Sequence, residues 1–336
     1  MEYILKELKN GQKIKVRDLQ LEVLSIMDEV DRICRKNKIE YLLIAGSALG
    51  AINYKGFIPW DDDMDIAIPR KHWEKFIKAM KKDLKDDFYF QCYETDKKYN
   101  IIMGPTMKVR KKGTYIEEVN FLLANRCKSG DGIFLDVVVY DNVSDNVLVD
   151  QFFRTIVKIL MPFYVLLDNL FINPIPLKKF ILWLSEKYAR MNEKSELVSQ
   201  RISIPWEKFL KEPKFLKEDV YPLREYEFEG RKFYSYNNIE KVMKQWYGNQ
   251  CCGSIEDDNW KETLPVEKRK PKHAVDVNFK GETPIEPAHL EYNKGYILGG
   301  ILIFIGLILF RDISFVLIGL GIVSIGITMI LKINNR

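Results

Sequence analysis

The chain has 336 residues, of which 47% are hydrophobic, and its formal net charge is +5. This length allows two domains or one large domain with additions, and the hydrophobic content is that of an ordinary globular protein. A net charge this small, spread along the chain, does not indicate a nucleic-acid binder.

The cysteines and histidines indicate neither a disulfide framework nor a structural zinc site. The five cysteines include no Cys-x-x-Cys pair, and the adjacent Cys251 and Cys252 are poorly placed to bridge each other. Only three histidines are present. The cysteine pattern favours a reducing compartment, and the low histidine count makes a structural zinc cluster unlikely.

The first part of the chain predicts a small core of mixed helices and strands. Apolar residues at helical spacing predict helices at residues 17–37, 48–53 and 72–80. Short apolar runs predict strands at residues 41–45, 64–68, 88–92, 106–110 and 133–140. We therefore expect an α+β catalytic core over residues 1–150, in which helices flank a small mixed sheet.

Residues 46–69, GSALGAINYKGFIPWDDDMDIAIP, form an unusually acidic segment. It holds four carboxylates, those of Asp61, Asp62, Asp63 and Asp65. Like charges at this spacing repel one another, so either water or a cation must solvate them. Residues two apart in a strand share a face, so Asp63 and Asp65 should point together, away from the buried apolar residues around them. We expect Asp61 and Asp62 to be the outer, more solvated pair.

A further carboxylate, Asp136, lies inside the apolar run IFLDVVVY at residues 133–140. Burying it without compensation would cost several kcal/mol. Two partners are open: an arginine such as Arg110, or a neighbouring strand that bears Asp63 and Asp65 and holds a metal ion. Carboxylate oxygens on rigid elements are the ligands that Mg²⁺ prefers, so the three aspartates form a candidate magnesium site.

Gly46 and Ser47 form a turn into a predicted helix, where backbone N–H groups and a hydroxyl can cradle a phosphate. Lys55 can pair with phosphate oxygens. Taken alone, such a turn is usually a helix cap, and an acidic run is usually solvated surface. In combination with Asp136, the order of these residues favours metal-assisted transfer at phosphorus.

This combination resembles the nucleotidyltransferase fold of the DNA polymerase beta type. Within that fold, residues 46–66 closely resemble the signature of the LicD family over more than twenty consecutive positions. Further resemblance lies in the segments MKVRKKGTY, IFLDV, FEGRKF and LPVEKRKPKH. The resemblance covers about residues 20–275 and does not include the C-terminal tail.

The resemblance implies a phosphotransferase that moves phosphocholine, or a related phosphoalcohol, from a CDP-alcohol such as CDP-choline. The acceptor would be a sugar hydroxyl of a teichoic acid, a lipopolysaccharide or another cell-surface glycan, which can be lipid-linked. By position, Asp63 and Asp65 would hold Mg²⁺ or Mn²⁺, and Asp136 would be a third ligand or would assist the attacking hydroxyl. The residues implied for the phosphates and the substrate are Gly46, Ser47, Lys55, Arg110 and His273.

Two other functions stay open on the sequence. A true nucleotidyltransferase would attach a nucleoside monophosphate to a small molecule or sugar and would release pyrophosphate. A membrane-tethered, non-catalytic binding protein would require a broken set of carboxylates, and here all three are present. No nucleic-acid partner is expected.

The remainder of the chain divides into three predicted parts. Residues 151–261 form a second lobe, in which the interrupted apolar stretch 152–184 predicts either a helical hairpin resting on a membrane or a buried helical pair. A hairpin with Gly230 at its turn and a helix at residues 239–247 follow. Residues 262–293 are charged and rich in proline, as in a linker.

The C-terminal part, residues 294–336, predicts a transmembrane helical hairpin. The runs 295–310 and 313–331 are uncharged and apolar, and the second run would span about 28 Å as a helix. Basic residues flank the pair, so both ends should be cytoplasmic. We therefore expect a membrane-anchored protein whose catalytic body is cytoplasmic.

Overall fold

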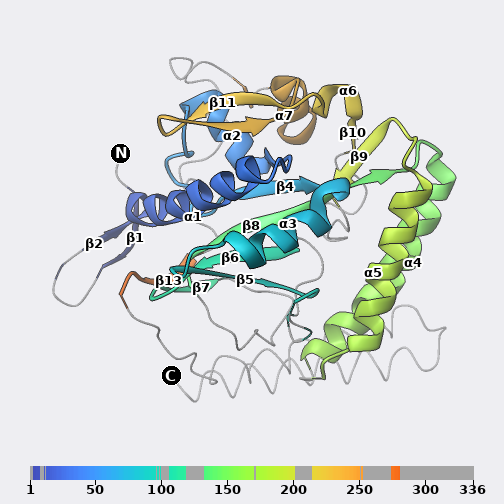
Figure 1. Ribbon diagram of the computed structural model, residues 1–336, viewed down its shortest axis with the longest axis horizontal. Helices are drawn as coiled ribbons and strands as arrows, with labels where there is room; N and C mark the ends of the chain where they lie inside the picture. The colour runs from blue at the N-terminus through green and yellow to red at the C-terminus, as the bar shows by residue number, and fades with distance from the viewer. Residues whose placement is uncertain are drawn as a thin grey trace, which may run out of the picture.

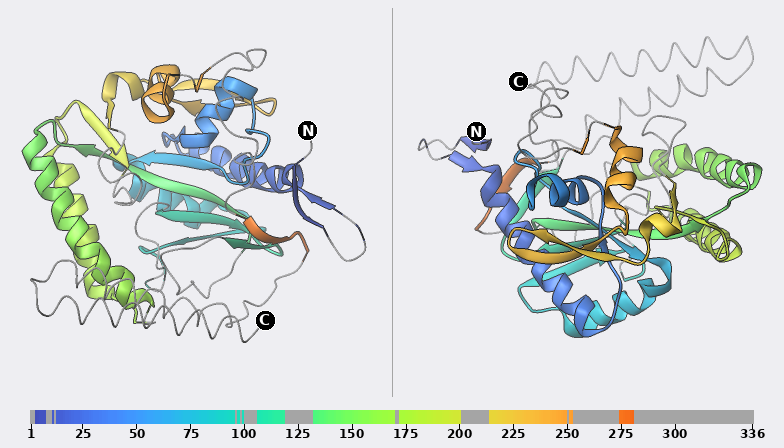
Figure 2. Two further views of the ribbon diagram at one scale, coloured as in Figure 1. Left: turned by 180° about the vertical axis from the view of Figure 1, so that it is seen from behind. Right: turned by 90° about the horizontal axis from the view of Figure 1, so that it is seen from above.

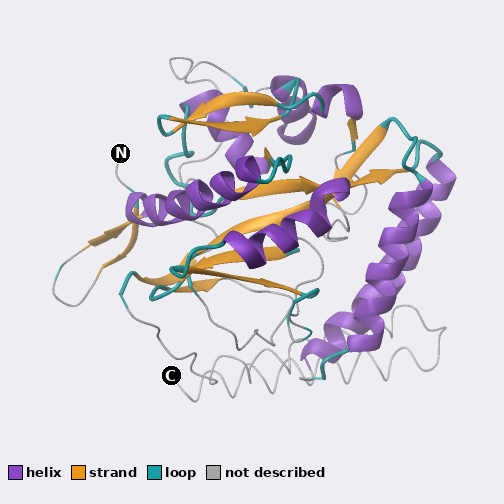
Figure 3. Cartoon of the chain, viewed as in Figure 1, coloured by secondary structure: helices purple, strands orange, loops and turns teal. Residues whose placement is uncertain are grey.

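The computed structural model describes most of the first 280 residues (Figure 1). The described residues are 3–7, 11, 13–95, 97, 99, 106–118, 132–169, 172–200, 214–249, 251–252 and 274–280. Helices flank a central group of strands, as expected for the predicted mixed core (Figure 3).

The strands are β1 (Ile4–Glu7), β2 (Lys13–Lys15), β3 (Leu42–Leu43), β4 (Asp65–Pro69), β5 (Phe88–Cys92), β6 (Met107–Lys111), β7 (Tyr115–Glu118), β8 (Phe134–Val143), β9 (Leu197–Gln200), β10 (Phe215–Leu216), β11 (Arg224–Phe228), β12 (Arg231–Ser235) and β13 (Ala274–Asn278). The helices are α1 (Val16–Lys36), α2 (Ala45–Tyr54), α3 (Arg70–Asp83), α4 (Val147–Asn169), α5 (Ile175–Met191), α6 (Lys217–Val220) and α7 (Ile239–Tyr247).

Within the described residues, seven strands form one mixed sheet around the long strand β8. The order β10–β9–β8–β4–β3 runs through the sheet, and the β5–β6 pair also joins β8. β6 pairs with the first part of β8 and β9 with its last part. β4 and β8 run parallel, whereas the other pairings of this sheet are antiparallel. The parallel pair sets the starts of β4 and β8 side by side.

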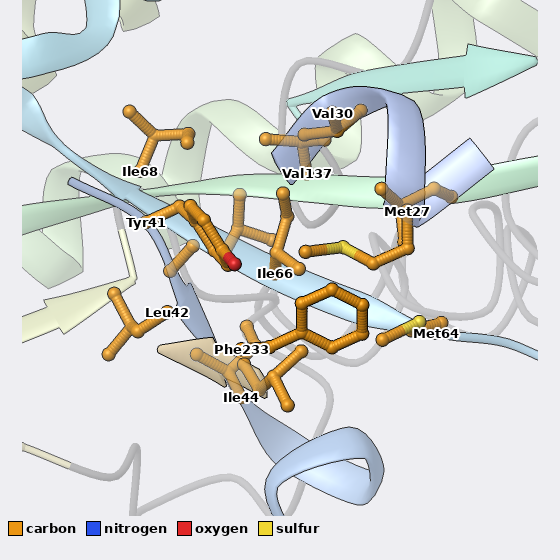
Figure 4. Close-up of a cluster of buried hydrophobic side chains, with 14 of the residues drawn as sticks. Met27, Val30, Tyr41, Leu42, Ile44, Met64, Ile66, Ile68, Val137 and Phe233 are labelled. Atoms are coloured by element: carbon orange, nitrogen blue, oxygen red, sulfur yellow. The ribbon is translucent and has the colours of Figure 1, made fainter. Parts of the chain in front are cut away.

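Helices α1 and α3 cover one face of this sheet (Figure 1). The amphipathic pattern of α1 buries its predicted apolar face, namely Leu19, Val23, Met27, Val30 and Cys34. Met64 and Ile66 are fully buried, as the two-residue period predicts. They belong to the same core cluster as Met27 of α1 and Phe233 of β12 (Figure 4). Since side chains alternate along a strand, Asp65 faces the opposite side of the sheet.

The later part of the described chain packs partly into the same core. The predicted hairpin is present as β11 and β12, and Gly230 at its turn has a φ of +71°, a conformation that glycine adopts readily. Phe228 and Phe233 from this hairpin join the core cluster that includes Ile66. Helix α2, helix α7 and the hairpin lie together beside β3 and β4 (Figure 1).

Helices α4 and α5 form an arm at the end of the sheet where β9 lies (Figures 1 and 2). They contact each other through a small cluster that includes Val157, Tyr164 and Ile181. Phe153 stacks on Tyr188 with ring centroids 3.9 Å apart. The inner sides of the two helices are therefore buried, as the alternative of a packed helical pair requires.

The structure contradicts our prediction of a membrane-anchored protein. No helix among the described residues has the length and apolar character needed to cross a membrane. The predicted hairpin at residues 294–336 lies outside the described residues, so the localisation that we inferred from it has no support.

Candidate functional site

Three neighbouring strands align charged residues on the face of the sheet that lies away from α1 and α3. Asp65 at the start of β4 is the register partner of Asp136 on β8, and Asp136 is the register partner of Lys108 on β6. Directly opposed residues of paired strands point to the same face. The sheet therefore brings Asp65 and Asp136 side by side, although they are far apart in the sequence.

The chain before β4 continues this alignment. The backbone N–H of Asp136 donates to the Met64 carbonyl at 3.0 Å, so the extended segment runs along β8 beyond the start of β4. Asp63 and Asp65 are half-buried on either side of the fully buried Met64. The structure thus supports the predicted neighbourhood of the two strands, and the ligand roles of Asp63, Asp65 and Asp136 stay predictions.

Lys108 is a site residue that we missed in the sequence. Its Nζ donates to Asp136 Oδ1 at 2.8 Å and lies 3.3 Å from the centroid of the Phe134 ring. Lys108 is 1% exposed and Asp136 is 9% exposed. Breaking such a buried charge pair is strongly destabilising. The sequence did contain a signal for Lys108. It lies two positions before Arg110 in a predicted strand, so the two basic side chains are expected on the same face.

Arg110, the arginine that we considered as a partner of Asp136, lies next to Lys108 on the same face and contacts other groups. Its Nε donates to Gln91 Oε1 at 2.6 Å, and its Nη1 donates to the Gly132 carbonyl at 2.6 Å. Arg110 is buried beside the Phe134 ring. Two buried cations therefore lie on β6, the strand that pairs with the part of β8 that carries Asp136.

The acidic loop before β4 differs from our expectation for Asp62. This residue is 3% exposed, and its Oδ2 accepts a hydrogen bond from the backbone N–H of Ala274 at 2.7 Å. The prediction of an outer, solvated Asp62 is wrong, because a residue from β13 covers it. One side-chain oxygen from each of Asp61, Asp62 and Asp63 lies within 4.8 Å of the other two, the one such group among the residues that the structure describes.

The Gly-Ser turn packs directly on this acidic segment. Gly46 and Ser47 lie in the first turn of α2, where backbone N–H groups lack partners within the helix. A Cβ at Gly46 would lie 2.7 Å from Asp61 Oδ2, so the Asp61 carboxylate packs directly on this glycine. Ser47 Oγ accepts a hydrogen bond from the Asp65 backbone N–H at 2.8 Å. The two halves of the predicted site are thereby joined.

Two polar side chains from other elements hold the loop between α2 and β4. The buried Gln20 of α1 donates from Nε2 to the carbonyls of Ile58 and Asp61 at 3.1 and 2.9 Å. Glu229, in the β11–β12 turn, accepts from the Phe57 backbone N–H at 3.3 Å and from both terminal nitrogens of Arg17 at 2.8 and 2.6 Å. The hydrogen bond from Arg17 is the main cause that lowers the pKa of Glu229.

Lys55 is not placed beside the aspartates. Lys55 follows the last residue of α2, about 15 Å along the helix from its first turn. Its Nζ lies 3.4 Å from Glu227 Oε2 in an exposed ion pair. His273 lies outside the described residues. The phosphate role of Lys55 and the substrate role of His273 thus stay predictions without a structural argument in their favour.

The donor atoms of the site suit a hard divalent cation. The carboxylates of Asp61, Asp62 and Asp63 are close to one another, and Asp65 and Asp136 are register partners. Oxygen donors without histidine or cysteine are the set that Mg²⁺ or Mn²⁺ prefers. The donor atoms are therefore of the kind that the predicted metal takes, and the ligand set of Asp63, Asp65 and Asp136 stays a prediction.

The part of the chain that builds this site matches a known family. Residues 38–141 match the family described as "LicD/FKTN/FKRP, nucleotidyltransferase domain". The lipopolysaccharide cholinephosphotransferase LicD of Haemophilus influenzae is 24% identical over 282 residues, which are 78% of this chain and 97% of that protein. An uncharacterised protein of Rickettsia typhi is 33% identical over 64 residues, which are 18% of this chain and 21% of that protein.

Proposed function

We propose that this chain, whose residues 38–141 match the LicD/FKTN/FKRP nucleotidyltransferase domain, transfers phosphocholine or a related phosphoalcohol from a CDP-alcohol to a sugar hydroxyl. The acceptor would belong to a cell-surface glycan, such as a lipopolysaccharide or teichoic-acid precursor. The observation that carries this proposal is the alignment of Asp65, Asp136 and Lys108 across three strands. It combines carboxylates with a buried cation beside a turn that suits phosphate.

The proposed metal ligands are Asp63, Asp65 and Asp136, with Mg²⁺ or Mn²⁺ as the cofactor. A bound divalent cation neutralises charge on the phosphate oxygens when it is present. Asp61, which packs on Gly46, lies between the acidic loop and the first turn of α2. This contact couples the acidic loop to the turn that would meet the phosphates of the donor.

Some residues of the chain would bind the donor phosphates, and a carboxylate would take the proton of the acceptor hydroxyl. The backbone N–H groups at Gly46 and the hydroxyl of Ser47 would meet the donor phosphates, and Arg110 would add positive charge. The acceptor hydroxyl would attack phosphorus, the bond to the CMP oxygen would break, and a carboxylate would take the hydroxyl proton. Asp136 is the proposed carboxylate if it is not a metal ligand, and Lys108 would hold its position.

The proposal is tested by the release of CMP from a series of CDP-alcohols in the presence of a glycan acceptor. We expect Asp65→Asn and Asp136→Asn each to lower the rate by at least about a hundredfold, because each removes a charge from the site. Asp86→Asn is the matched control, since Asp86 is exposed in the turn after α3. Rates of Asp65→Asn and Asp136→Asn near that of the control would contradict the proposed roles.

The family description favours one alternative function, a true nucleotidyltransferase. That reaction would attach a nucleoside monophosphate to a small molecule or sugar and would release pyrophosphate. The mass added to the acceptor separates the two reactions, since it identifies the group transferred. Addition of a nucleotide would replace our proposal by this alternative, whereas addition of a phosphoalcohol would support it.

A further inference from the structure

The outer side of the α4–α5 arm exposes large apolar side chains. On α4, Leu148, Phe152, Ile159 and Phe163 recur at spacings of four, seven and four residues, which places them on one side of the helix. Their exposed fractions are 75, 70, 59 and 57%, respectively. The opposite side of α4 carries the buried Val157 and Tyr164. The exposed stripe therefore points away from the arm's own core.

Helix α5 has a matching stripe that contains one lysine. Phe180, Trp183, Lys187 and Met191 recur at spacings of three, four and four residues, and all of them are exposed. Ile181 and Tyr188, on the other side, pack against α4. Lys179 is exposed next to this stripe, and the helix has four basic residues and one acidic residue in all. Of these basic residues, Lys178 is buried and Arg190 pairs with Glu186, so Lys179 and Lys187 give the outer side of α5 its positive charge.

From these observations we propose that the outer face of the α4–α5 arm binds peripherally to an anionic lipid surface. We call this face the arm face and define it by Leu148, Phe152, Ile159, Phe163, Phe180, Trp183, Lys187 and Met191. Helices with Trp, Phe and Leu on one side and Lys beside them lie in the plane of the lipid headgroups. The proposal is independent of the transferase reaction and involves no segment that crosses the bilayer.

Charge decides between a lipid surface and a second copy of the chain. In a contact between copies, Lys187 would be buried among apolar residues, and desolvating its ammonium group would be costly. At a lipid surface the apolar stem of Lys187 packs beside Trp183 and Met191, and its ammonium group reaches phosphate headgroups. The same argument applies to Lys179 at the edge of the face.

Flotation of the full chain with vesicles tests the arm face. We expect binding to phosphatidylcholine vesicles that contain phosphatidylglycerol, weaker binding without the anionic lipid, and weaker binding at high salt. The double variant Phe152→Asp, Phe163→Asp should bind at least about tenfold more weakly. It replaces two apolar side chains with carboxylates, which have the same charge as the anionic lipid and are repelled by it. Leu21→Asp is the matched control, since Leu21 is 50% exposed on α1, away from the arm.

A local readout is needed because the chain also contains the apolar runs 295–310 and 313–331. Quenching of tryptophan fluorescence by brominated lipids reports which indole reaches the acyl chains. We expect Trp183→Phe to remove a large part of the quenching, whereas Trp246→Phe on α7 should leave it unchanged. Equal quenching in these two variants would overturn the proposal. A dimer that the double variant dissociates, with unchanged vesicle binding, would also overturn it and would assign the arm face to a contact between copies.

Discussion

The candidate site and the α4–α5 arm distribute polar and apolar side chains in opposite ways. At the site, the charged residues Asp62, Lys108 and Arg110 are at most 5% exposed. On the arm, Phe152 and Leu148 are at least 70% exposed. Both regions depart from the usual rule that charged side chains are exposed and large apolar ones are buried. Buried charges and exposed apolar patches both mark regions that are candidates for function.

The two departures are supported differently by the fold. The charged residues of the site are held by hydrogen bonds from several elements, as Asp62 is by Ala274 and Asp136 by Lys108. The exposed apolar residues of the arm lie on helices whose other side is packed. Their exposure therefore lowers the stability of the unbound chain only a little. We therefore expect substitutions at the site to change stability and activity together, and substitutions on the arm face to change neither.

The largest effect on stability is expected for Lys108→Met. This substitution removes a buried partner of the Asp136 carboxylate, which typically costs about 3–5 kcal/mol. Urea unfolding measures the loss. Adding Asp136→Asn to Lys108→Met should recover part of it, because the neutral amide needs less compensation.

The matched control for this prediction is Lys112→Met, at an exposed position that follows β6. Its effect should stay within about 0.5 kcal/mol. If Lys108→Met costs no more than Lys112→Met, the buried pair does not stabilise the fold, and the contrast between site and arm loses its main support.

A smaller loss is expected for Gln20→Met. The substitution keeps the volume but removes two hydrogen bonds to the Ile58 and Asp61 carbonyls, at about 1–3 kcal/mol for buried groups. Thermal unfolding measures this loss, and the rate of CMP release should fall with it because the acidic loop loses a support. Gln245→Met is the control, since Gln245 makes one exposed bond to the Lys214 carbonyl.

The contact of Glu229 predicts a small dependence of stability on pH. The hydrogen bond from Arg17 lowers the pKa of Glu229 in the folded chain below its ordinary value of 4.5. The unfolded chain therefore takes up the proton first as the pH falls. The contribution is complete above about pH 4.5 and is lost as the pH drops below it.

The size of this pH effect should stay below about 1 kcal/mol, because solvent screens the half-exposed Arg17. Urea unfolding at a series of pH values measures it. Glu229→Gln should lose stability less steeply between pH 4.5 and lower values than the parent chain does. Identical slopes for the two proteins would mean that Glu229 has no altered pKa.

The smallest effect on stability is expected on the arm face. Phe152→Asp should change the free energy of unfolding by no more than about 0.5 kcal/mol, because Phe152 is 70% exposed. Val157→Asp, on the buried side of the same helix, should cost several kcal/mol because it buries a charge. A large loss in Phe152→Asp would show that the arm face is covered by protein in the folded chain.

The sequence by itself determined the local elements and the orientation of the acidic strand. Helical spacing predicted α1 and α3, and the two-residue period placed Met64 in the core and Asp65 on the other face. These features depend on neighbours within one turn or one strand, so the order of residues is enough to predict them. The glycine at the β11–β12 turn was predicted for the same reason.

Only the tertiary structure decided what each charged residue contacts. The pairing of β6 with β8 gave Asp136 the partner Lys108 rather than Arg110, and the pairing of β13 with β7 brought Ala274 onto Asp62. The tertiary structure also places Lys55 at the far end of α2, beside Glu227. These contacts join segments far apart in the chain. Their register depends on the packing of the whole sheet, which no local pattern of residues contains.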